Sequence, residues 1–493
     1  MSRSWTPKSI PQLTNEQESL LLERVCQYSL ANGLVMYPPG FTISNADIAP
    51  VTLFPTPFPK DLFEHAVKVQ KLFNSLYAQV VSGQREWLLE ISKELAKFDR
   101  DFTGQLYKTY IESVELSGGK PLQPLSLGLF RSDYMYDEIE HSIKQIEFNT
   151  VSVSFGGLST KVGKLHQYLN SNGSYNPTEK FYGEGIPVSN SINELALGLA
   201  AANAAYNDKV NKSQKPPVVL FIVQDNERNC FDQRHVEYAL LDNHLTLSYR
   251  CTLEAAKEFT FIKDDKLYIK TTSEEVGVIY YRSGYSPLDY ETDPELTWSN
   301  RLYLETTYAI KCPSLLTQLS GTKKVQQALT SAELVQSFMP ELSSQATQEL
   351  LDTFVKIYPF DDSEEGKIAK KLAFESPEKF VLKPQREGGG NNIYKENIPA
   401  FLNSIDESEW GAYILMEIIN PPTYENKILR LGQVHQEHII LELGIFGTIL
   451  FNEDTGEVLS NENAGHLLRS KVSSSNEGGV AAGFGCLDNV YLQ

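Results

Sequence analysis

A continuous apolar segment, Val218–Val223, most constrains what this chain can fold into. Two prolines, at positions 216 and 217, precede it, and none of its six residues is polar. This pattern is typical of a parallel strand that is buried on both faces of a sheet. A second segment of this kind, Val276–Tyr281, follows after an intervening helical stretch. The alternation of strand, helix and strand predicts an α/β fold.

Other segments carry clear local signals. Thr14 can cap a helix, with Gln17 three residues later completing a capping box. The pair Asn32-Gly33 then ends that helix. We expect the proline-rich passage 38–59 to be ordered and to cross the surface. Further helices are predicted within 62–116 and at 195–206, and further strands at 125–130, at 143–148 and on both sides of a glycine loop within 379–394.

Composition excludes several classes of protein. The chain has 493 residues, enough to bury a core without disulfides or metals. Its 44 basic and 63 acidic residues leave a net charge of −19, which argues against a general nucleic-acid binder. An acidic protein can still bind an anion where its lysines and arginines converge in one cleft.

The cysteines and the hydropathy pattern indicate a cytoplasmic protein. The five cysteines are widely spaced and form no metal-binding motif, as expected for free thiols in a reducing compartment. The amino terminus lacks the order of a secretory signal, and no apolar run approaches the ~20 residues of a membrane span. We therefore expect no membrane partner.

A glycine-rich segment, 383–392, is the most informative motif. Consecutive glycines allow backbone N–H groups to approach a polyanion closely. Lys383 and Arg386 add positive charge, and Glu387 offers an oxygen ligand for Mg²⁺. The segment is not a Walker A loop. A phosphate cradle and an ordinary tight hairpin fit this composition equally well.

Two further motifs carry possible chemistry. Alternation along a strand places Glu147 and Asn149 on one face, with Ile146 and Phe148 on the other. A carboxylate beside an amide oxygen suits Mg²⁺, although a solvent-facing strand would look the same. The run of tiny residues at 478–483 can close over a very small ligand, and its alternative is a flexible turn near the carboxyl terminus.

Taken in order, these segments closely resemble the eukaryotic glutathione synthetases, which are ATP-grasp ligases. The resemblance extends from 36–39 to 487–488, and fungal members look most similar. The matching segments include 130–134 (FRSDY), 146–149 (IEFN), 226–229 (NERN), 319–324 (LSGTKK), 383–392, 416–417 and 478–483.

The resemblance implies a definite reaction. Members of the family join the carboxyl group of γ-glutamyl-cysteine to the amine of glycine and cleave ATP to ADP and phosphate. A carboxylate is a poor electrophile, so ATP first converts it to an acyl phosphate, which glycine then attacks. Such catalysis depends on positioning and charge neutralisation, which explains why no catalytic Cys or His arrangement is evident. The resemblance also implies two Mg²⁺ ions per active site and a homodimer.

The resemblance assigns roles to individual residues. It implies that Glu147, Asn149 and Glu387 hold the metal, and that Arg131, Lys383 and Arg469 are catalytic. The residues implied to contact ATP are Lys323, Lys383, Glu387, Gly388, Gly389, Gly390, Asn392, Tyr394, Met416, Glu417, Ile418, Ile419, Glu442, Lys471 and Glu477. Those implied to bind the other substrates are Arg131, Ser152, Ser154, Glu227, Arg228, Asn229, Gln233, Arg282, Tyr285, Arg469, Val480 and Ala481.

The resemblance also implies a domain arrangement. Residues 1–215 and 325–493 together would form the ATP-grasp body, with a mobile lid at roughly 357–425. An α/β substrate-binding domain would be inserted at 216–324. Two other hypotheses stay open at this point: the same ligase chemistry with another small amine, and an inactive nucleotide-binding scaffold.

Overall fold

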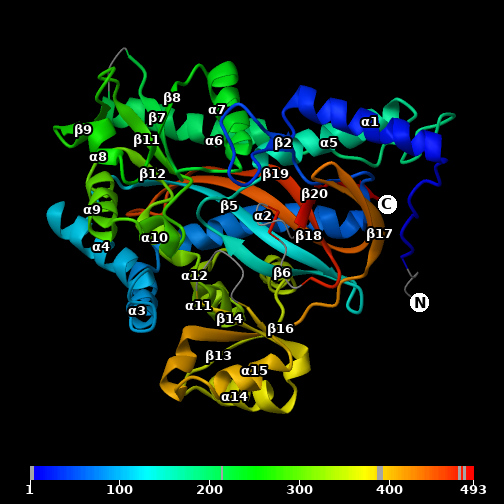
Figure 1. Ribbon diagram of the computed structural model, residues 1–493. Coiled ribbons are helices and arrows are strands. Elements are labelled where there is room, and N and C mark those ends of the chain that lie inside the picture. Colours follow the sequence, from blue (N-terminus) through cyan, green and yellow to red (C-terminus); the bar gives the residue numbers. More distant parts are fainter. Residues whose placement is uncertain (1–4, 212–214, 386–391, 476–478, 481–484) are drawn as a thin grey trace.

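One mixed sheet of eleven strands organises the computed structural model (Figure 1). The structure describes residues 5–211, 215–385, 392–475, 479–480 and 485–493. The strand order is β17 (Tyr424–Arg430), β3 (Val51–Thr52), β20 (Gly485–Asp488), β19 (Val458–Val472), β18 (Gln433–Asn452), β5 (Leu125–Asp137), β12 (Ile310–Cys312), β11 (Val276–Tyr281), β7 (Val218–Val223) and β8 (Ser248–Thr252), with β6 (Ser142–Asn149) paired to β5.

The two halves of this sheet differ in direction. Strands β5, β12, β11, β7 and β8 are parallel neighbours, whereas β18 and β6 flank β5 in antiparallel pairs. The two apolar segments at 218–223 and 276–281 pair in parallel, so the prediction made from them is confirmed. Strand β5 belongs to both halves of the sheet. It therefore connects the parallel strands from the middle of the chain to the antiparallel strands from its carboxyl-terminal part.

Helices cover both faces of the sheet (Figure 1). Alternate residues of β7 enter two different hydrophobic clusters: Leu220 packs in one and Phe221 in the other. The helices whose buried residues contribute mainly to the first cluster are α2 (Lys60–Ser82), α3 (Arg85–Leu95), α4 (Thr103–Leu116) and α10 (Leu315–Ser320). Those that contribute mainly to the second are α1 (Asn15–Asn32), α5 (Gly156–Ser171), α6 (Ser191–Tyr206) and α7 (Cys230–His244).

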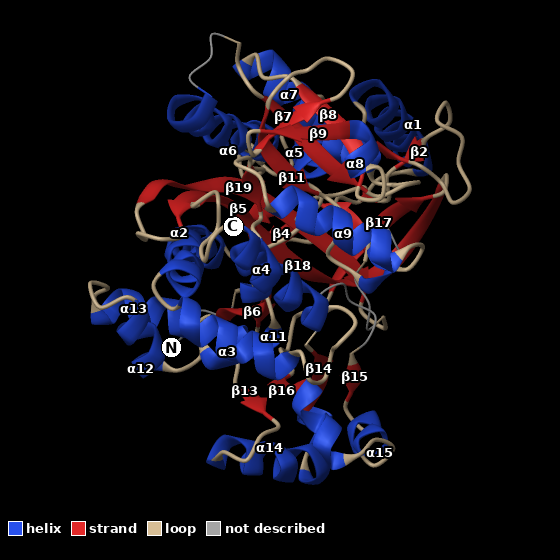
Figure 2. Cartoon of the chain, turned by 90° about the vertical axis from the view of Figure 1, so that its left-hand side faces the viewer, coloured by secondary structure: helices blue, strands red, loops and turns tan. Residues whose placement is uncertain are grey.

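A second, smaller unit lies apart from this body. Its four-stranded sheet has the order β13 (Ile357–Pro359), β16 (Tyr413–Glu417), β14 (Phe380–Pro384) and β15 (Ile393–Tyr394). Figures 1 and 2 both show it below the body, covered on its outer side by α14 (Glu364–Glu375) and α15 (Asn397–Leu402). Leu382 and Leu415 pack in a cluster with these helices, whereas Val381 and Met416 face the other way.

The remaining elements are short or peripheral. They are β1 (Val35–Met36) with β2 (Asp47–Ile48), β4 (Thr56–Phe58) with β21 (Val490–Leu492), β9 (Thr260–Lys263) with β10 (Lys266–Ile269), α8 (Ala256–Phe259), α9 (Pro294–Glu305), α11 (Lys323–Ala328), α12 (Ala332–Phe338), α13 (Ser344–Leu351), η1 (Asn207–Asn211), η2 (Pro287–Tyr290), η3 (Pro377–Lys379) and η4 (Glu407–Ala412). Within the described part of the chain, no helix has the length and apolar character that crossing a membrane requires.

Most local predictions are confirmed. The Thr14–Gln17 capping box is present, and the predicted strands and helices all form. The helical region 62–116 is divided into α2, α3 and α4. The expectation for the proline-rich passage is wrong for 51–58, which is buried. This segment is internal because β3 and β4 pair with β20 and β21 from the carboxyl terminus.

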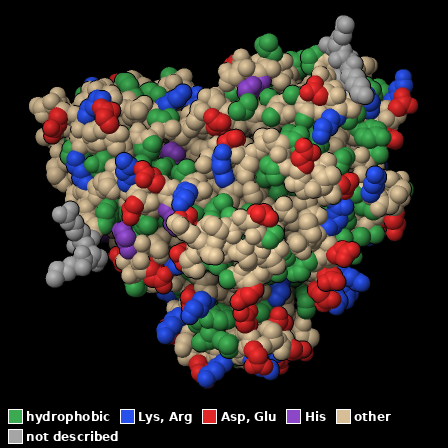
Figure 3. All heavy atoms as spheres, turned by 180° about the vertical axis from the view of Figure 1, so that it is seen from behind, with side chains coloured by type: hydrophobic (Ala, Val, Ile, Leu, Met, Phe, Trp, Pro, Cys, Tyr) green, Lys and Arg blue, Asp and Glu red, His purple; other side chains and the backbone are tan. Residues whose placement is uncertain are grey.

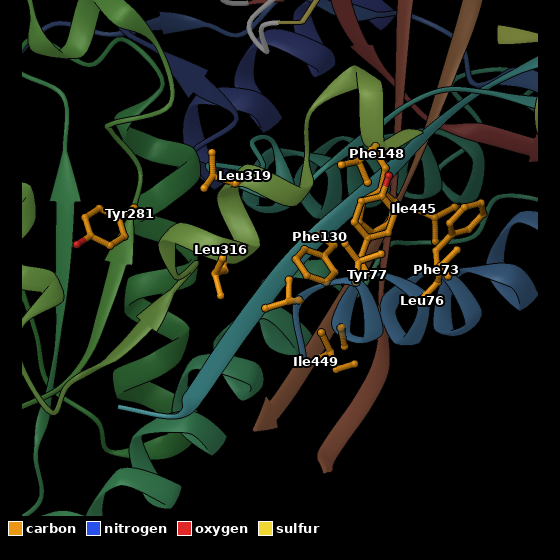
Figure 4. Packing of buried hydrophobic residues seen from close by; sticks show 14 of the residues in the cluster. Phe73, Leu76, Tyr77, Phe130, Phe148, Tyr281, Leu316, Leu319, Ile445 and Ile449 are labelled. Atoms are coloured by element: carbon orange, nitrogen blue, oxygen red, sulfur yellow. The ribbon is translucent and has the colours of Figure 1, made fainter. Parts of the chain in front are cut away.

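Phe148 anchors β6 against α2 (Figure 4). Its ring stacks on Tyr77 with centroids 3.9 Å apart, and the rings of Phe130 and Phe73 lie 5.2 and 5.8 Å away. Because side chains alternate along a strand, this packing turns the neighbouring Glu147 and Asn149 away from α2.

We expect Phe148→Ala to lower the free energy of unfolding by about 3–5 kcal/mol, since it leaves a cavity among aromatic rings. Phe148→Leu, which keeps most of the volume, should cost under about 1.5 kcal/mol. Urea unfolding followed by circular dichroism measures both. Equal effects of the two variants would show that the ring packing does not hold β6.

Candidate functional site

A cavity of about 460 Å³ lies between the two sheets. Strands β5, β6, β18 and β19 line it from the large sheet, and β14, β15 and β16 line it from the small one. Its size is in the usual range for small-molecule sites, about 300–1,000 Å³.

One end of this cavity is apolar. Val381 and Met416 come from the inner face of the small sheet, and Ile146 and Ile440 come from the large sheet. Met135, Ile418, Ile419 and Pro421 complete the lining there. Apolar side chains facing one another across a gap suit a flat, uncharged ring.

The other end is cationic: Lys323 pairs with Glu147 there, Arg131 and Arg469 pair with Asp133, and the charge of Lys383 also acts on Glu147. The described lining includes six cations, Arg131, Lys323, Lys383, Lys395, Arg469 and Lys471, against three carboxylates, Glu147, Glu417 and Glu442. This excess contrasts with the net charge of −19 on the whole chain. On the face of the molecule seen in Figure 3, acidic and basic side chains are interspersed. The cations therefore converge in one cleft, as an anion-binding site requires.

The polar groups come from one face of four adjacent strands. Asn149 on β6 lies opposite Arg131 on β5, and Glu442 on β18 lies opposite Arg469 on β19. Asp133 is opposite Glu147 on one side and Gly444 on the other. Alternation along each strand keeps these side chains on a common face.

A bulge in β6 changes one prediction. The register with β5 shifts between Asp133 and Tyr134, so Ile146 is an extra residue in the ladder. Ile146 lines the cavity with Glu147 and does not join the core with Phe148. The expected grouping of Ile146 with Phe148 is therefore wrong, whereas Glu147 and Asn149 do share a face.

Glu147 is held in its ionised form. Its carboxylate accepts a hydrogen bond from the Lys323 ammonium at 2.8 Å. Burial acts to raise the pKa of Glu147, but the positive charges of Lys323, Lys383 and Arg469 outweigh it and hold the pKa well below its ordinary value. The carboxylate is thus charged at any physiological pH.

Lys383 holds its proton less tightly than an ordinary lysine does. Its ammonium donates to the carbonyl oxygen of Ile146 at 3.1 Å. Burial, together with the nearby charge of Lys323, lowers the pKa of Lys383 to about 8. An anion bound beside Lys383 would oppose both effects and favour the protonated form.

Glu442 bridges two further cations. Its oxygens lie 3.2 Å from an Arg469 Nη2 and 3.2 Å from the Lys471 ammonium. Burial acts to raise the pKa of Glu442, but Arg469 and Lys471 lower it below its ordinary value. The arginine is thereby fixed on the cavity wall.

Two of the three predicted metal ligands lie together. The Asn149 amide nitrogen donates to an Asp133 oxygen at 3.1 Å and to the Arg131 carbonyl at 3.3 Å, which leaves the amide oxygen as an acceptor. An ionised carboxylate and an amide oxygen on one strand suit a hard cation such as Mg²⁺. Across the described residues, no group of three His, Cys, Asp or Glu side chains is placed to hold a metal.

The structure brings most of the predicted site residues to this cavity. The described residues that line it are Arg131, Glu147, Asn149, Ser152, Ser154, Tyr285, Lys323, Lys383, Asn392, Tyr394, Met416, Glu417, Ile418, Ile419, Glu442, Arg469 and Lys471. The predicted residues Glu387, Gly388, Gly389, Gly390, Glu477 and Ala481 lie outside the described residues.

Other predicted substrate residues do not line the cavity. Arg282 donates to the Ser154 hydroxyl at 2.8 Å. Glu227 accepts from the Asn229 backbone at 2.7 Å and from the Gln233 amide at 3.2 Å. Arg228 donates to the Tyr37 carbonyl at 3.0 Å, and the buried Val480 follows the lining residue Gly479.

Sequence reasoning missed Asp133 and Gly444. Asp133 stands two positions after Arg131, so strand alternation alone would have placed it on the same face. Gly444 lies in the middle of a long strand, where glycine often indicates a close approach by another group. A Cβ at Gly444 would lie 2.8 Å from Arg131 Cδ and 3.0 Å from an Asp133 oxygen.

Comparisons with known proteins identify relatives over the whole chain. A family model described as eukaryotic glutathione synthase, ATP binding domain, matches residues 15–492. The glutathione synthetase large chain of Schizosaccharomyces pombe is 40% identical, with 98% of this chain and 99% of that protein covered. The glutathione synthetase of Homo sapiens is 38% identical, with 97% of each covered. A solved glutathione synthetase-like effector from Globodera pallida, in apo form, has a TM-score of 0.75 at 21% identity, covers 99% and 100% of the two chains, and thus shares the fold.

We expect Gly444→Ala to destabilise the protein by about 1–3 kcal/mol, because the new methyl group would displace Arg131 and Asp133. Gly163→Ala is the matched control: it lies within α5, and the atoms nearest to its added methyl group would be 3.4–3.6 Å away. That control should be neutral or stabilising by up to about 1 kcal/mol. Thermal unfolding of both variants measures the difference, and a stabilising effect at position 444 would contradict this account of the glycine.

Proposed function

The chain belongs to the family of eukaryotic glutathione synthetases, and on this premise we propose that the cavity between its two sheets is the active site. The family activity is the ATP-dependent ligation that forms glutathione from γ-glutamyl-cysteine and glycine, and this chain carries it. The observation that carries the proposal is the joining of an apolar slot to a cationic end in one cavity whose described lining includes six cations. Such a pair of environments suits a nucleotide, whose base is apolar and flat and whose phosphates are anionic.

ATP would span the length of this cavity. Its adenine would lie in the slot beside Met416, Glu417, Ile418 and Ile419, and its phosphates beside Lys323, Lys383 and Lys471. Asn392, Tyr394 and Glu442 line the same region. The implied contacts through Glu387, the glycines 388–390 and Glu477 complete this hypothesis, and these residues lie outside the described part of the chain.

Mg²⁺ fits the oxygen donors that β6 presents. Glu147 is held ionised and Asn149 offers an amide oxygen, so we propose that these two residues and Glu387 hold the metal, two ions per site. Bound Mg²⁺ would neutralise charge on the β- and γ-phosphates. Lys323 hydrogen-bonds Glu147, so the same carboxylate also orients a lysine toward the phosphates.

The dipeptide would bind at the cationic end with its carboxylate toward the γ-phosphate. A carboxylate oxygen would attack the γ-phosphorus, forming the acyl phosphate and releasing ADP. The glycine amine would then attack the acyl carbon, lose a proton and release phosphate. Arg131, Lys383 and Arg469 would stabilise the negative charge that develops in these steps, in a place where few waters compete.

Other residues implied by the resemblance would complete the dipeptide pocket. Ser152, Ser154 and Tyr285 line the cavity, and Arg282 reaches it through Ser154. Glu227, Arg228, Asn229 and Gln233, which do not line the cavity, would complete the binding of the dipeptide. Val480 and Ala481 would cover glycine with the run of small residues.

We also propose that the chain has the ATP-grasp domain arrangement. The small sheet has its own hydrophobic cluster, which supports a lid at roughly 357–425. The β12–β5 pairing joins the proposed substrate domain, 216–324, to the body formed by 1–215 and 325–493 through the register pair Lys311 and Ser126. Fluorescence energy transfer between labels on α3 and α14 would detect movement of the lid when ATP binds.

A homodimer is also part of the proposal. Large apolar side chains are exposed on and after α7, with Tyr238 at 57%, Leu241 at 44% and Leu245 at 82%. Such a patch favours contact with a second protein surface. Analytical ultracentrifugation at micromolar concentration would give twice the chain mass if the proposal holds.

The direct test of the function is the release of ADP by the purified protein. With Mg²⁺, ATP, γ-glutamyl-cysteine and glycine all present, we expect ADP and glutathione in equal amounts. Omission of any one component should abolish glutathione formation. ATP binding without ADP release in the complete mixture would contradict the proposed function.

The pKa of Lys383 predicts how nucleotide affinity depends on pH. Above pH 8 the free enzyme loses this positive charge, so affinity for a non-hydrolysable ATP analogue should fall by up to about tenfold per pH unit. Below pH 8 the affinity should not gain further from this lysine. Lys383→Arg, which stays charged, should remove the transition, and Lys395→Arg at the cavity edge should retain it. Calorimetric titrations on both sides of pH 8 would measure this, and identical profiles for wild type and Lys383→Arg would contradict it.

A further inference from the structure

We infer that Asp133 is a positioning residue that holds two substrate-binding arginines and a metal-binding amide in one arrangement. This inference rests on the proposed function, which assigns roles to Arg131, Arg469 and Asn149. Asp133 itself is 1% exposed and lies behind the cavity wall, so it does not act as a ligand.

Its two oxygens bind three side chains from three strands. Oδ1 accepts from Arg131 Nε at 2.6 Å. Oδ2 accepts from Arg131 Nη2 at 2.7 Å, Arg469 Nη2 at 3.0 Å and Asn149 Nδ2 at 3.1 Å. Arg131 is on β5, Asn149 on β6 and Arg469 on β19. One carboxylate therefore fixes groups that the proposed function assigns to the dipeptide and to Mg²⁺.

The surrounding chain makes space for this arrangement. Gly444 on β18 lies directly opposite Asp133, and any side chain there would meet the Arg131–Asp133 pair. Two guanidinium groups share the single Asp133 carboxylate, and Glu442 is shared between Arg469 and Lys471. Positive charge is left over at the cavity wall, where an anionic substrate can use it.

The division of bonds between the two oxygens makes the inference specific. An Asn side chain at 133 can keep its oxygen at the Oδ2 position, where three donors meet. Its amide group would then face the Arg131 Nε–H, and two donors cannot bond to each other. Asp133→Asn should therefore loosen Arg131 while Asn149 and Arg469 keep their partner. Asp133→Ala removes one hydrogen-bond partner from each of the three side chains, although Arg469 still contacts Glu442 and Asn149 still donates to the Arg131 carbonyl.

Kinetics of the whole enzyme can separate these effects. For Asp133→Asn we expect the KM for γ-glutamyl-cysteine to rise by about tenfold or more, the usual effect of losing a hydrogen bond between charged groups. The Mg²⁺ concentration at half-maximal rate should stay within about twofold of wild type. For Asp133→Ala both quantities should rise by about tenfold or more. In both variants, the KM for ATP should change less than the KM for γ-glutamyl-cysteine.

The control is a buried carboxylate of the same kind outside the site. Glu305 pairs with the buried Arg301 at 2.9 Å, and its side chain is 7% exposed. Glu305→Gln should lower thermal stability without changing the KM for γ-glutamyl-cysteine or the Mg²⁺ requirement. If Asp133 had a purely structural role, its variants would behave in the same way. Their thermal stability and the amount of folded enzyme would fall, but the KM for γ-glutamyl-cysteine and the Mg²⁺ concentration at half-maximal rate would stay at their wild-type values.

The outcomes distinguish the two levels of proposal. A wild-type protein that forms no glutathione in the complete mixture overturns the proposed function before any variant is made. An active wild type with Asp133→Ala at wild-type KM and Mg²⁺ values overturns the positioning role alone. If Asp133→Ala does not fold, Asp133→Asn alone tests the inference. In that variant, an Mg²⁺ requirement that rises as much as the KM for γ-glutamyl-cysteine would contradict the division of bonds between Oδ1 and Oδ2.

Discussion

The pairing of β5 with its two antiparallel neighbours is the constraint on which the rest of the structure depends. Strand β5 runs beside β18 over ten register pairs, from Leu125 opposite Asn452 to Tyr134 opposite Leu443, and carries β6 on its other edge. Side chains alternate along each strand, so a slip of one residue would turn the charged groups into the core and the aromatic rings into the cavity. Phe148, stacked on Tyr77, opposes such a slip because it must stay against α2.

Electrostatic compensation explains how this acidic chain maintains a cationic cavity. Two carboxylates of the cavity wall contact cations: Glu147 contacts Lys323, and Glu442 contacts Arg469 and Lys471. Partnered charges of this kind avoid the large cost of isolated buried ions. The carboxylates also orient the cations, so the cavity wall is ordered by contacts among its own side chains. Such preorganisation is what catalysis by charge stabilisation needs.

Much of this could be predicted from residues alone. The apolar segment 218–223 indicated a parallel strand, and the capping signals at Thr14 and Gln17 placed the start of α1. Glu147 and Asn149 were chosen as metal ligands from alternation and from the family resemblance, and the structure places both on the cavity wall. The strand and helix predictions succeeded because they depend on local periodicity and on residue types that a short window contains, whereas the metal-binding role of Glu147 and Asn149 stays a prediction.

The remaining features depend on contacts between distant parts of the chain. The burial of 51–58 follows from pairing with β20 and β21, more than 400 residues away in the sequence. The bulge at Ile146 depends on the register with β5, and the role of Gly444 depends on Arg131 and Asp133 lying across the sheet. The sequence by itself determined the fold class, the strand and helix signals, the charge balance and the family. Only the tertiary structure decided which charged groups share a partner, because strand register and sheet order bring Asp133, Asn149 and Arg469 together. Asp133 and Arg469 are 336 positions apart in the sequence.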